Sequence, residues 1–99
     1  MAVVKINAIE VPEGGGAELE RRFAHRAGAV DDAPGFLGFE LLRPTDGTNV
    51  YFVYTRWESE EQFQAWVKSD AFGRGHAESS QQPVGTGSHL KEFEVVLAT

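Results

Sequence analysis

Short segments with strand-like and helix-like periodicity alternate along this chain of 99 residues, and their order restricts the folds that it can adopt. Residues 3–11 are rich in Val and Ile and predict a strand, which ends at Pro12. From Ala17 to about Asp31, apolar residues recur at helical spacing and predict a helix. The first third of the chain is therefore expected to form a strand followed by a helix.

The middle of the chain predicts a hairpin of two strands and a second helix. Residues 36–43 and 50–57 have strand-like composition, and the Asp46-Gly47 pair between them is typical of a hairpin turn. Ser59 and Gln62 have the spacing of a capping box, which predicts that a helix begins there.

The last third of the chain is less regular. A short helix is expected near residues 70–78, and a loop is expected around Pro83, Gly85 and Gly87. The closing strand is predicted at residues 90–97.

The predicted order is β-α-β-β-α-β, which is the order of the α+β, ferredoxin-like fold. In that fold four strands form one antiparallel sheet, and both helices pack on the same face of it. A chain of 99 residues is too short for two cores, so residues 1–99 are expected to form a single domain.

The second face of such a sheet would be uncovered in a monomer. Bulky residues alternate to both faces of the strand 50–57: Tyr51, Val53 and Trp57 on one side, and Val50, Phe52 and Tyr54 on the other. Strands that are buried on both faces have this composition. We therefore expect a homodimer, a dimeric α+β barrel in which the second faces pack together.

Composition excludes several classes of function. The formal net charge is −6 and no basic run is present, which argues against nucleic acid and anionic membranes as partners. Cysteine is absent, which excludes disulfides and thiolate metal sites. No apolar stretch approaches the ~20 residues that span a bilayer, and the first residues resemble a strand rather than a signal peptide. The expected location is the cytoplasm.

Asn7 is an unusual residue for the middle of a strand. Alternation places it on one face with Val3, Lys5, Ile9 and Val11. Asn is disfavoured in strands, and a buried amide costs free energy unless its hydrogen bonds are satisfied. Asn7 therefore either bonds to neighbouring backbone or lies at the sheet rim, or it is a hydrogen-bond donor directed into a cavity.

Two further residues could line the same cavity. Trp66 follows Phe63 on the second predicted helix, and its indole could either fill the core or form a rigid wall for a flat ligand. His76 is either a surface or structurally bonded residue or an iron ligand, because neutral imidazole is a common ligand of iron and the usual proximal ligand of heme. On a helix, Phe72 would share a face with His76.

Arg22 and Arg26 lie one turn apart on the first predicted helix, with Phe23 beside them. They form either a solvated surface or a pair that binds the carboxylates of a ligand, because the guanidinium group suits that role.

Motifs of other chemistries are absent from the sequence. His25 and His89 lack the i,i+3 or i,i+4 spacing of a chelating helix, so a zinc site is weakly supported. There is no Ser-His-Asp motif and no dinucleotide fingerprint. The glycines at 14–16 are not followed by Lys and Ser or Thr, so they indicate a turn between strand and helix rather than a phosphate-binding loop.

The chain resembles the IsdG-type heme-degrading monooxygenases, and most closely their small actinobacterial members, within the antibiotic-biosynthesis-monooxygenase superfamily. The resemblance covers nearly the whole chain, in the segments VVKINAIEVP, ERRFAHRA, PGFLGFELLRP, YFVYTRWESEEQFQAW and EFEVVL. The discriminating residues are Asn7, Trp66 and His76, which are similar to the Asn, Trp and His of the family's catalytic triad.

The resemblance implies a role for each of these residues. His76 would ligate heme iron, Asn7 would donate a hydrogen bond near the distal oxygen ligand, and Trp66 would press on the ring and help to ruffle it. Heme would be both substrate and cofactor, opened with O₂ and an electron donor or reductase to release iron and a linear tetrapyrrole. Further heme contacts are expected from Phe23, Arg22, Arg26, Phe63 and Phe72.

Two other functions stay open on the same scaffold. The first is a cofactor-free monooxygenase of a quinol-like aromatic compound, with Trp66 and His76 lining the pocket. The second is a heme-binding carrier that does not degrade its ligand.

Overall fold

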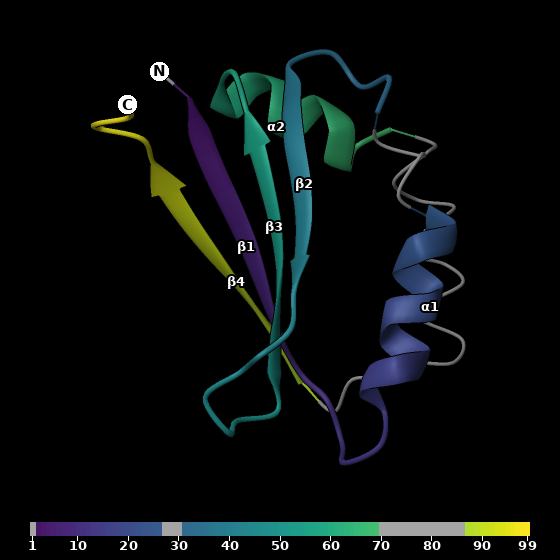
Figure 1. Cartoon of the computed structure of the whole chain (residues 1–99). Helices are drawn as coiled ribbons and strands as arrows, with labels where there is room; N and C mark the ends of the chain where they lie inside the picture. The colour runs from purple at the N-terminus through teal and green to yellow at the C-terminus, as the bar shows by residue number, and fades with distance from the viewer. Residues whose placement is uncertain (1, 27–30, 70–86) are drawn as a thin grey trace.

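The computed structural model describes residues 2–26, 31–69 and 87–99. Within these ranges four strands and two helices follow the predicted order β-α-β-β-α-β (Figure 1). The elements are β1 (Val3–Glu10), α1 (Gly16–Arg26), β2 (Phe36–Leu42), β3 (Val50–Trp57), α2 (Glu60–Val67) and β4 (Gly87–Glu94). The short helix predicted near residues 70–78 falls outside the described residues.

The four strands form one sheet in the order β2-β3-β1-β4, and each adjacent pair is antiparallel. Figure 1 shows α2 behind this sheet and α1 beside its β2 edge. Both helices contact odd-numbered residues of β1 and β3, so they pack on the same face, which we call the helix face. The predicted ferredoxin-like fold is confirmed.

Two small clusters of buried residues anchor the helices at opposite ends of the helix face. One cluster joins α2 to the sheet through Val3, Trp57 and Phe63. The other joins α1 to the sheet through Val11, Leu19 and Tyr51. The middle of the helix face lies between these two anchors.

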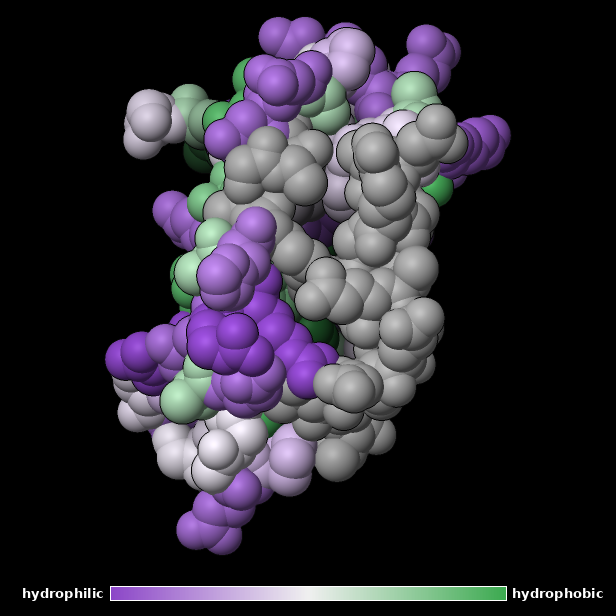
Figure 2. Space-filling model, turned by 90° about the vertical axis from the view of Figure 1, so that its right-hand side faces the viewer, coloured by the Kyte–Doolittle hydropathy of each residue, from purple (hydrophilic) through white to green (hydrophobic). Residues whose placement is uncertain are grey.

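A polar contact also holds α1 on the sheet. The Tyr51 hydroxyl donates a hydrogen bond to Glu20 at 2.6 Å, and Arg43 forms an ion pair with the same carboxylate. The pKa of Glu20 is lowered to about 2, mainly by the Arg43 guanidinium and to a smaller extent by the Tyr51 hydroxyl. Hydrophilic residues gather on the side of the molecule that α1 occupies (Figure 2).

The turn into α1 requires small residues, as the run of glycines indicates. Gly14 has φ +82°, which favours glycine. A Cβ atom at Gly16 would lie 2.4 Å from the Tyr51 hydroxyl oxygen, so a larger residue would displace that side chain.

The predicted start of α2 is confirmed. Ser59 is the N-cap, and its hydroxyl oxygen accepts a hydrogen bond from the backbone N–H of Gln62 at 3.3 Å. The 50–57 strand also has its predicted limits. Among the described residues no helix is long and apolar enough to cross a membrane.

The predicted limits of the last strand are wrong at both ends. β4 runs from Gly87 to Glu94 instead of 90–97. Its hydrogen-bonding partner is β1, in which Glu10 pairs with Gly87 and Val3 pairs with Glu94. The length of β1 therefore fixes that of β4, whatever the strand propensity of the residues that follow.

Smaller corrections apply to the other elements. β1 ends at Glu10 and β2 ends at Leu42, one residue before the predicted ends in each case. α1 begins at Gly16, one residue before its predicted start, and its described part ends at Arg26.

Candidate functional site

Asn7 lies on the helix face, which it shares with Val3 and Ile9 as the alternation predicts. Its neighbours across the sheet are Val53 on β3 and Leu90 on β4. Asn7 and Val53 are half-buried, and Leu90 is 49% exposed although it faces the helix side. The described helices therefore leave this middle row partly accessible, and Asn7 brings a side-chain amide to it.

Trp66 lies on α2 and is half-buried. Its ring packs on Trp57, with 5.4 Å between ring centroids and 35° between ring planes. It also borders the cluster around Val3, Trp57 and Phe63. Trp66 therefore contacts the core and keeps some accessible surface, and its role as the wall of a ligand site stays a prediction.

The sheet register relates the positions of these two residues. Trp66 packs on Trp57, which pairs with Val3 at the start of β1. Asn7 lies four residues further along β1, or about 13 Å at the rise of an extended strand. The backbone of Asn7 is therefore displaced along the helix face from the Val3 end, where Trp66 packs.

The two phenylalanines that the structure describes among the expected heme contacts differ in burial. Phe23 on α1 is half-buried and stacks on Phe39 of β2, with 6.0 Å between centroids and 26° between planes. Phe63 is 7% exposed and lies in the core against Trp57. Phe23 is thus better exposed for ligand contact, and the contact of Phe63 with heme stays a prediction.

Arg22 forms an ion pair within its own helix. Its Nε atom lies 2.9 Å from Oε1 of Glu18, and 24% of its side chain is exposed. The guanidinium groups of Arg21 and Arg22 lower the pKa of Glu18 to about 2. A ligand carboxylate that binds Arg22 would compete with Glu18. The side chain of Arg26 is outside the described part of the structure, so the predicted pair stays a prediction.

His76 and Phe72 fall outside the described residues, and the convergence of His76 with Asn7 and Trp66 stays a prediction. The other two histidines are placed. His25 is exposed on α1, and His89 pairs with Ala8, which projects to the sheet face opposite the helices. In residues 2–26, 31–69 and 87–99, no group of three or more His, Cys, Asp or Glu residues could hold a metal ion.

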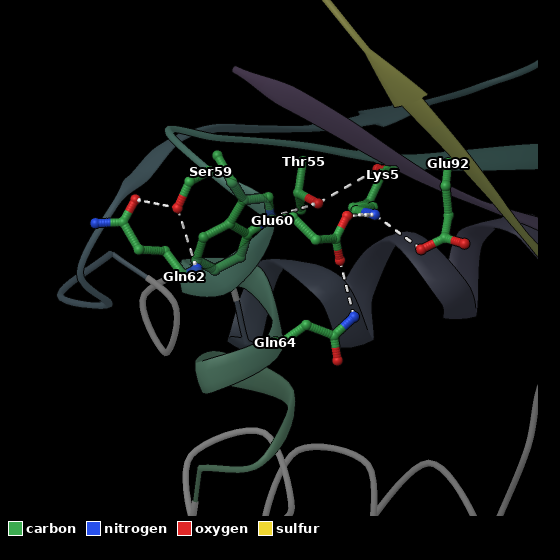
Figure 3. A network of polar contacts seen from close by, with 8 residues as sticks. Lys5, Thr55, Ser59, Glu60, Gln62, Gln64 and Glu92 are labelled. Carbon is green, nitrogen blue, oxygen red and sulfur yellow. Dashed lines mark hydrogen bonds and ion pairs between the residues drawn. The ribbon is translucent and has the colours of Figure 1, made fainter. Parts of the chain in front are cut away.

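The structure also identifies a residue that the sequence prediction did not single out. Lys5 is 3% exposed, and its ammonium group binds Glu60 of α2 and Glu92 of β4 (Figure 3). Burial acts to lower the pKa of Lys5, but hydrogen bonds and the charges of the two carboxylates raise it above its ordinary value. Alternation placed Lys5 on the same face as Asn7, but no local signal identified its two distant partners.

Comparisons with known proteins agree with this fold. Residues 2–78 match the model of the family described as "Antibiotic biosynthesis monooxygenase". A protein of Mycobacterium tuberculosis named "Heme oxygenase (mycobilin-producing)" is 63% identical over 97 residues, which cover 98% of this chain and 91% of that protein. A "Heme-degrading monooxygenase" of Bacillus thuringiensis is 37% identical over 84 residues, which cover 82% of this chain and 77% of that protein.

Solved structures of oxygenases superpose on this chain as well. The heme-degrader MhuD of Mycobacterium tuberculosis, with two hemes bound in its active site, superposes with a TM-score of 0.86 at 62% identity, covering 98% of each chain. SnoaB of Streptomyces nogalater, a cofactor-independent oxygenase, superposes with a TM-score of 0.80 at 25% identity, covering 98% of this chain and 95% of that one. The chain belongs to the antibiotic biosynthesis monooxygenase family, and within it to the heme-degrading monooxygenases.

Proposed function

We propose that this protein is a heme-degrading monooxygenase that opens the heme ring with O₂ and an electron donor, releasing iron and a linear tetrapyrrole. The observation that carries the proposal is the 63% identity, over nearly the whole chain, with a mycobilin-producing heme oxygenase. The cofactor-free alternative has weaker support, because the cofactor-independent oxygenase SnoaB is only 25% identical.

The residues on the helix face fit heme as a ligand. Most of the side chains there are apolar or aromatic, which suits a flat macrocycle, and Trp66 and Phe23 are both half-buried. Arg22 brings a positive charge to α1 that could meet a propionate, at the expense of its pairing with Glu18.

Each proposed catalytic residue contributes a different interaction. Bound heme supplies the iron at which O₂ is activated. The Asn7 amide provides an N–H donor that stabilises negative charge as it develops on oxygen. Trp66 would press a rigid indole against the ring, and macrocycle distortion is one way in which a protein tunes heme. His76 would provide the imidazole ligand of the iron, and Phe72 would provide an apolar contact with the heme.

Heme titration followed by reduction tests the proposal against both alternatives. A Soret band that saturates on titration is expected for an enzyme or a carrier, and its absence would favour a cofactor-free oxygenase. Ascorbate added under air should then bleach the Soret band if the protein is an enzyme. A stable band under those conditions would indicate a carrier.

We further propose that the protein is a homodimer joined through the sheet face opposite the helices, which we call the outer face. None of the described helices covers this face (Figure 1). It carries large apolar side chains, of which Phe93 is 51% and Leu42 is 40% exposed. Stable interfaces bury about 800 Å² per partner, an area that a four-stranded sheet can supply. A cytoplasmic location stays a prediction.

Charges on the outer face support one arrangement of the dimer. One row of paired residues crosses the outer face from edge to edge. It runs from Glu40 on β2 through Tyr54 on β3 and Ile6 on β1 to Lys91 on β4. Glu40 and Lys91 are both exposed. A two-fold axis parallel to the strands would bring Glu40 against Lys91 of the partner subunit, whereas a perpendicular axis would bring like charges together.

Charge reversal tests this arrangement. Glu40→Lys and Lys91→Glu should each weaken the dimer on the order of tenfold at low salt, because each converts two attractive pairs per dimer into repulsive ones. The double variant should restore wild-type affinity. Glu13→Lys makes the same charge change in the exposed turn before α1 and should have little effect. Sedimentation of a fluorescently labelled protein on dilution measures these dissociation constants, and unchanged single variants would contradict the arrangement.

A further inference from the structure

Lys5 is a buried charged residue at the junction of three elements. Its Nζ atom donates hydrogen bonds to Glu60 Oε1 at 2.5 Å and to Glu92 Oε1 at 2.8 Å. The same atom lies 4.8 Å from the centroid of the Phe63 ring, within the range of a cation–π contact. Figure 3 shows the ammonium group between the two carboxylates.

These contacts connect the strand that carries Asn7 with the helix that carries Trp66. Lys5 precedes Asn7 by two residues on the same face of β1. Glu60 is the first residue of α2, and Phe63 lies one turn before Trp66 on that helix. Lys5 is therefore a second contact, beside the Val3, Trp57 and Phe63 cluster, between the strand of Asn7 and the helix of Trp66.

The energetics of this cluster indicate that Lys5 contributes more to the orientation of α2 than to the stability of the fold. Removing an ammonium group from water costs free energy that an ion pair often only offsets. The side chains of Glu60 and Glu92 are 48% and 56% exposed, so either carboxylate can be rehydrated if Lys5 loses its charge. An apolar side chain of similar shape at position 5 should therefore leave the fold intact.

We propose that Lys5 is a positioning residue, which fixes α2 and with it Trp66 relative to Asn7. The proposal rests on the proposed function in one respect, namely that Asn7 and Trp66 contact heme. Lys5 itself acts through α2.

The two tryptophans of this chain provide a readout that does not depend on heme. Trp57 is fully buried on β3, and its Nε1 donates a hydrogen bond to the Thr55 hydroxyl at 3.0 Å, so it is a fixed reference. The centroid of the Trp66 ring lies 5.4 Å from that of Trp57. Two indoles this close give a coupled circular-dichroism signal in the far ultraviolet, and its amplitude depends on their mutual orientation.

Two variants break the contact from opposite ends. Lys5→Met removes the charge and keeps an unbranched side chain over Phe63. Glu60→Ala removes the partner carboxylate on α2. Glu61→Ala is the matched control, because Glu61 is also an acidic residue in the first turn of α2 and is exposed. It controls for the effect of a lost acidic residue on the helix itself.

We expect the coupled tryptophan signal of the apo protein to be reduced in Lys5→Met and Glu60→Ala, but retained in Glu61→Ala. Unfolding in urea should stay cooperative in all three variants. With heme bound, the single-turnover decay rate should fall about tenfold or more in the first two, since small misplacements of groups around a reacting centre are costly. The heme dissociation constant should change far less than the rate.

A wild-type tryptophan signal and decay rate in Lys5→Met and Glu60→Ala would overturn the proposal. So would a loss of stability with normal decay in the folded fraction, because Lys5 would then only support the fold. If the wild-type protein does not degrade heme, the proposed function fails, but the apo tryptophan signal still decides whether Lys5 orients Trp66.

Discussion

Replacing His76 by alanine is expected to abolish well-defined ligation of heme iron and, with it, heme degradation. A neutral imidazole is the usual proximal ligand of heme, and the chain has three histidines. Of the other two, His89 projects to the outer face, away from the proposed site, and His25 is exposed on α1. The measurement is the absorption spectrum of the ferric complex, which should lose the features of a histidine-ligated heme.

His25→Ala and His89→Ala are the controls for this experiment, and both should leave the ferric spectrum nearly unchanged. An unaltered spectrum in His76→Ala would remove His76 from the site. A changed spectrum in His25→Ala instead would move the iron ligand to α1.

Asn7→Ala is expected to bind heme with little loss of affinity but to lose most of its degradation activity, on the order of 100-fold in rate. The amide lies on the helix face between the two helix anchors, where its effect should be on oxygen rather than on iron ligation. Heme titration gives the affinity, and single-turnover decay of the Soret band under air gives the rate.

Val53→Ala provides a matched control, because Val53 pairs directly with Asn7 and lies on the same face. It changes the apolar surface beside Asn7 without removing a hydrogen-bond donor, so its decay rate should stay much closer to that of the wild type. If heme affinity fell in parallel with rate in Asn7→Ala, the amide would be maintaining the shape of the site instead of acting on oxygen.

The fold could be predicted from the sequence where local rules decide it. The period of two in a strand correctly placed Asn7 on one face with Val3 and Ile9, and the spacing of Ser59 and Gln62 correctly located the start of α2. The length of β4 depends on a distant partner. Val96 and Leu97 have high strand propensity but are 85% and 83% exposed, since β1 begins at Val3 and offers them no pairing residue.

The proposed site could be predicted only in part, for a related reason. Trp66 and Phe63 are three residues apart on one helix, yet one is half-buried and the other lies in the core. Helical spacing alone does not distinguish them. Lys5 binds carboxylates that lie 55 and 87 residues further along the chain, so its burial follows from tertiary structure and not from its neighbours.

The decay of a stoichiometric heme complex of the wild-type protein tests the central claim most directly. Ascorbate is added under air in the presence of a ferrous-iron chelator, and the Soret band and the chelated iron are followed together. We expect the Soret band to disappear while about one iron per heme is released, and we expect neither change when O₂ is excluded. A Soret band that persists in air with reductant, or one that bleaches without iron release, would contradict assignment of this protein as a heme-degrading monooxygenase.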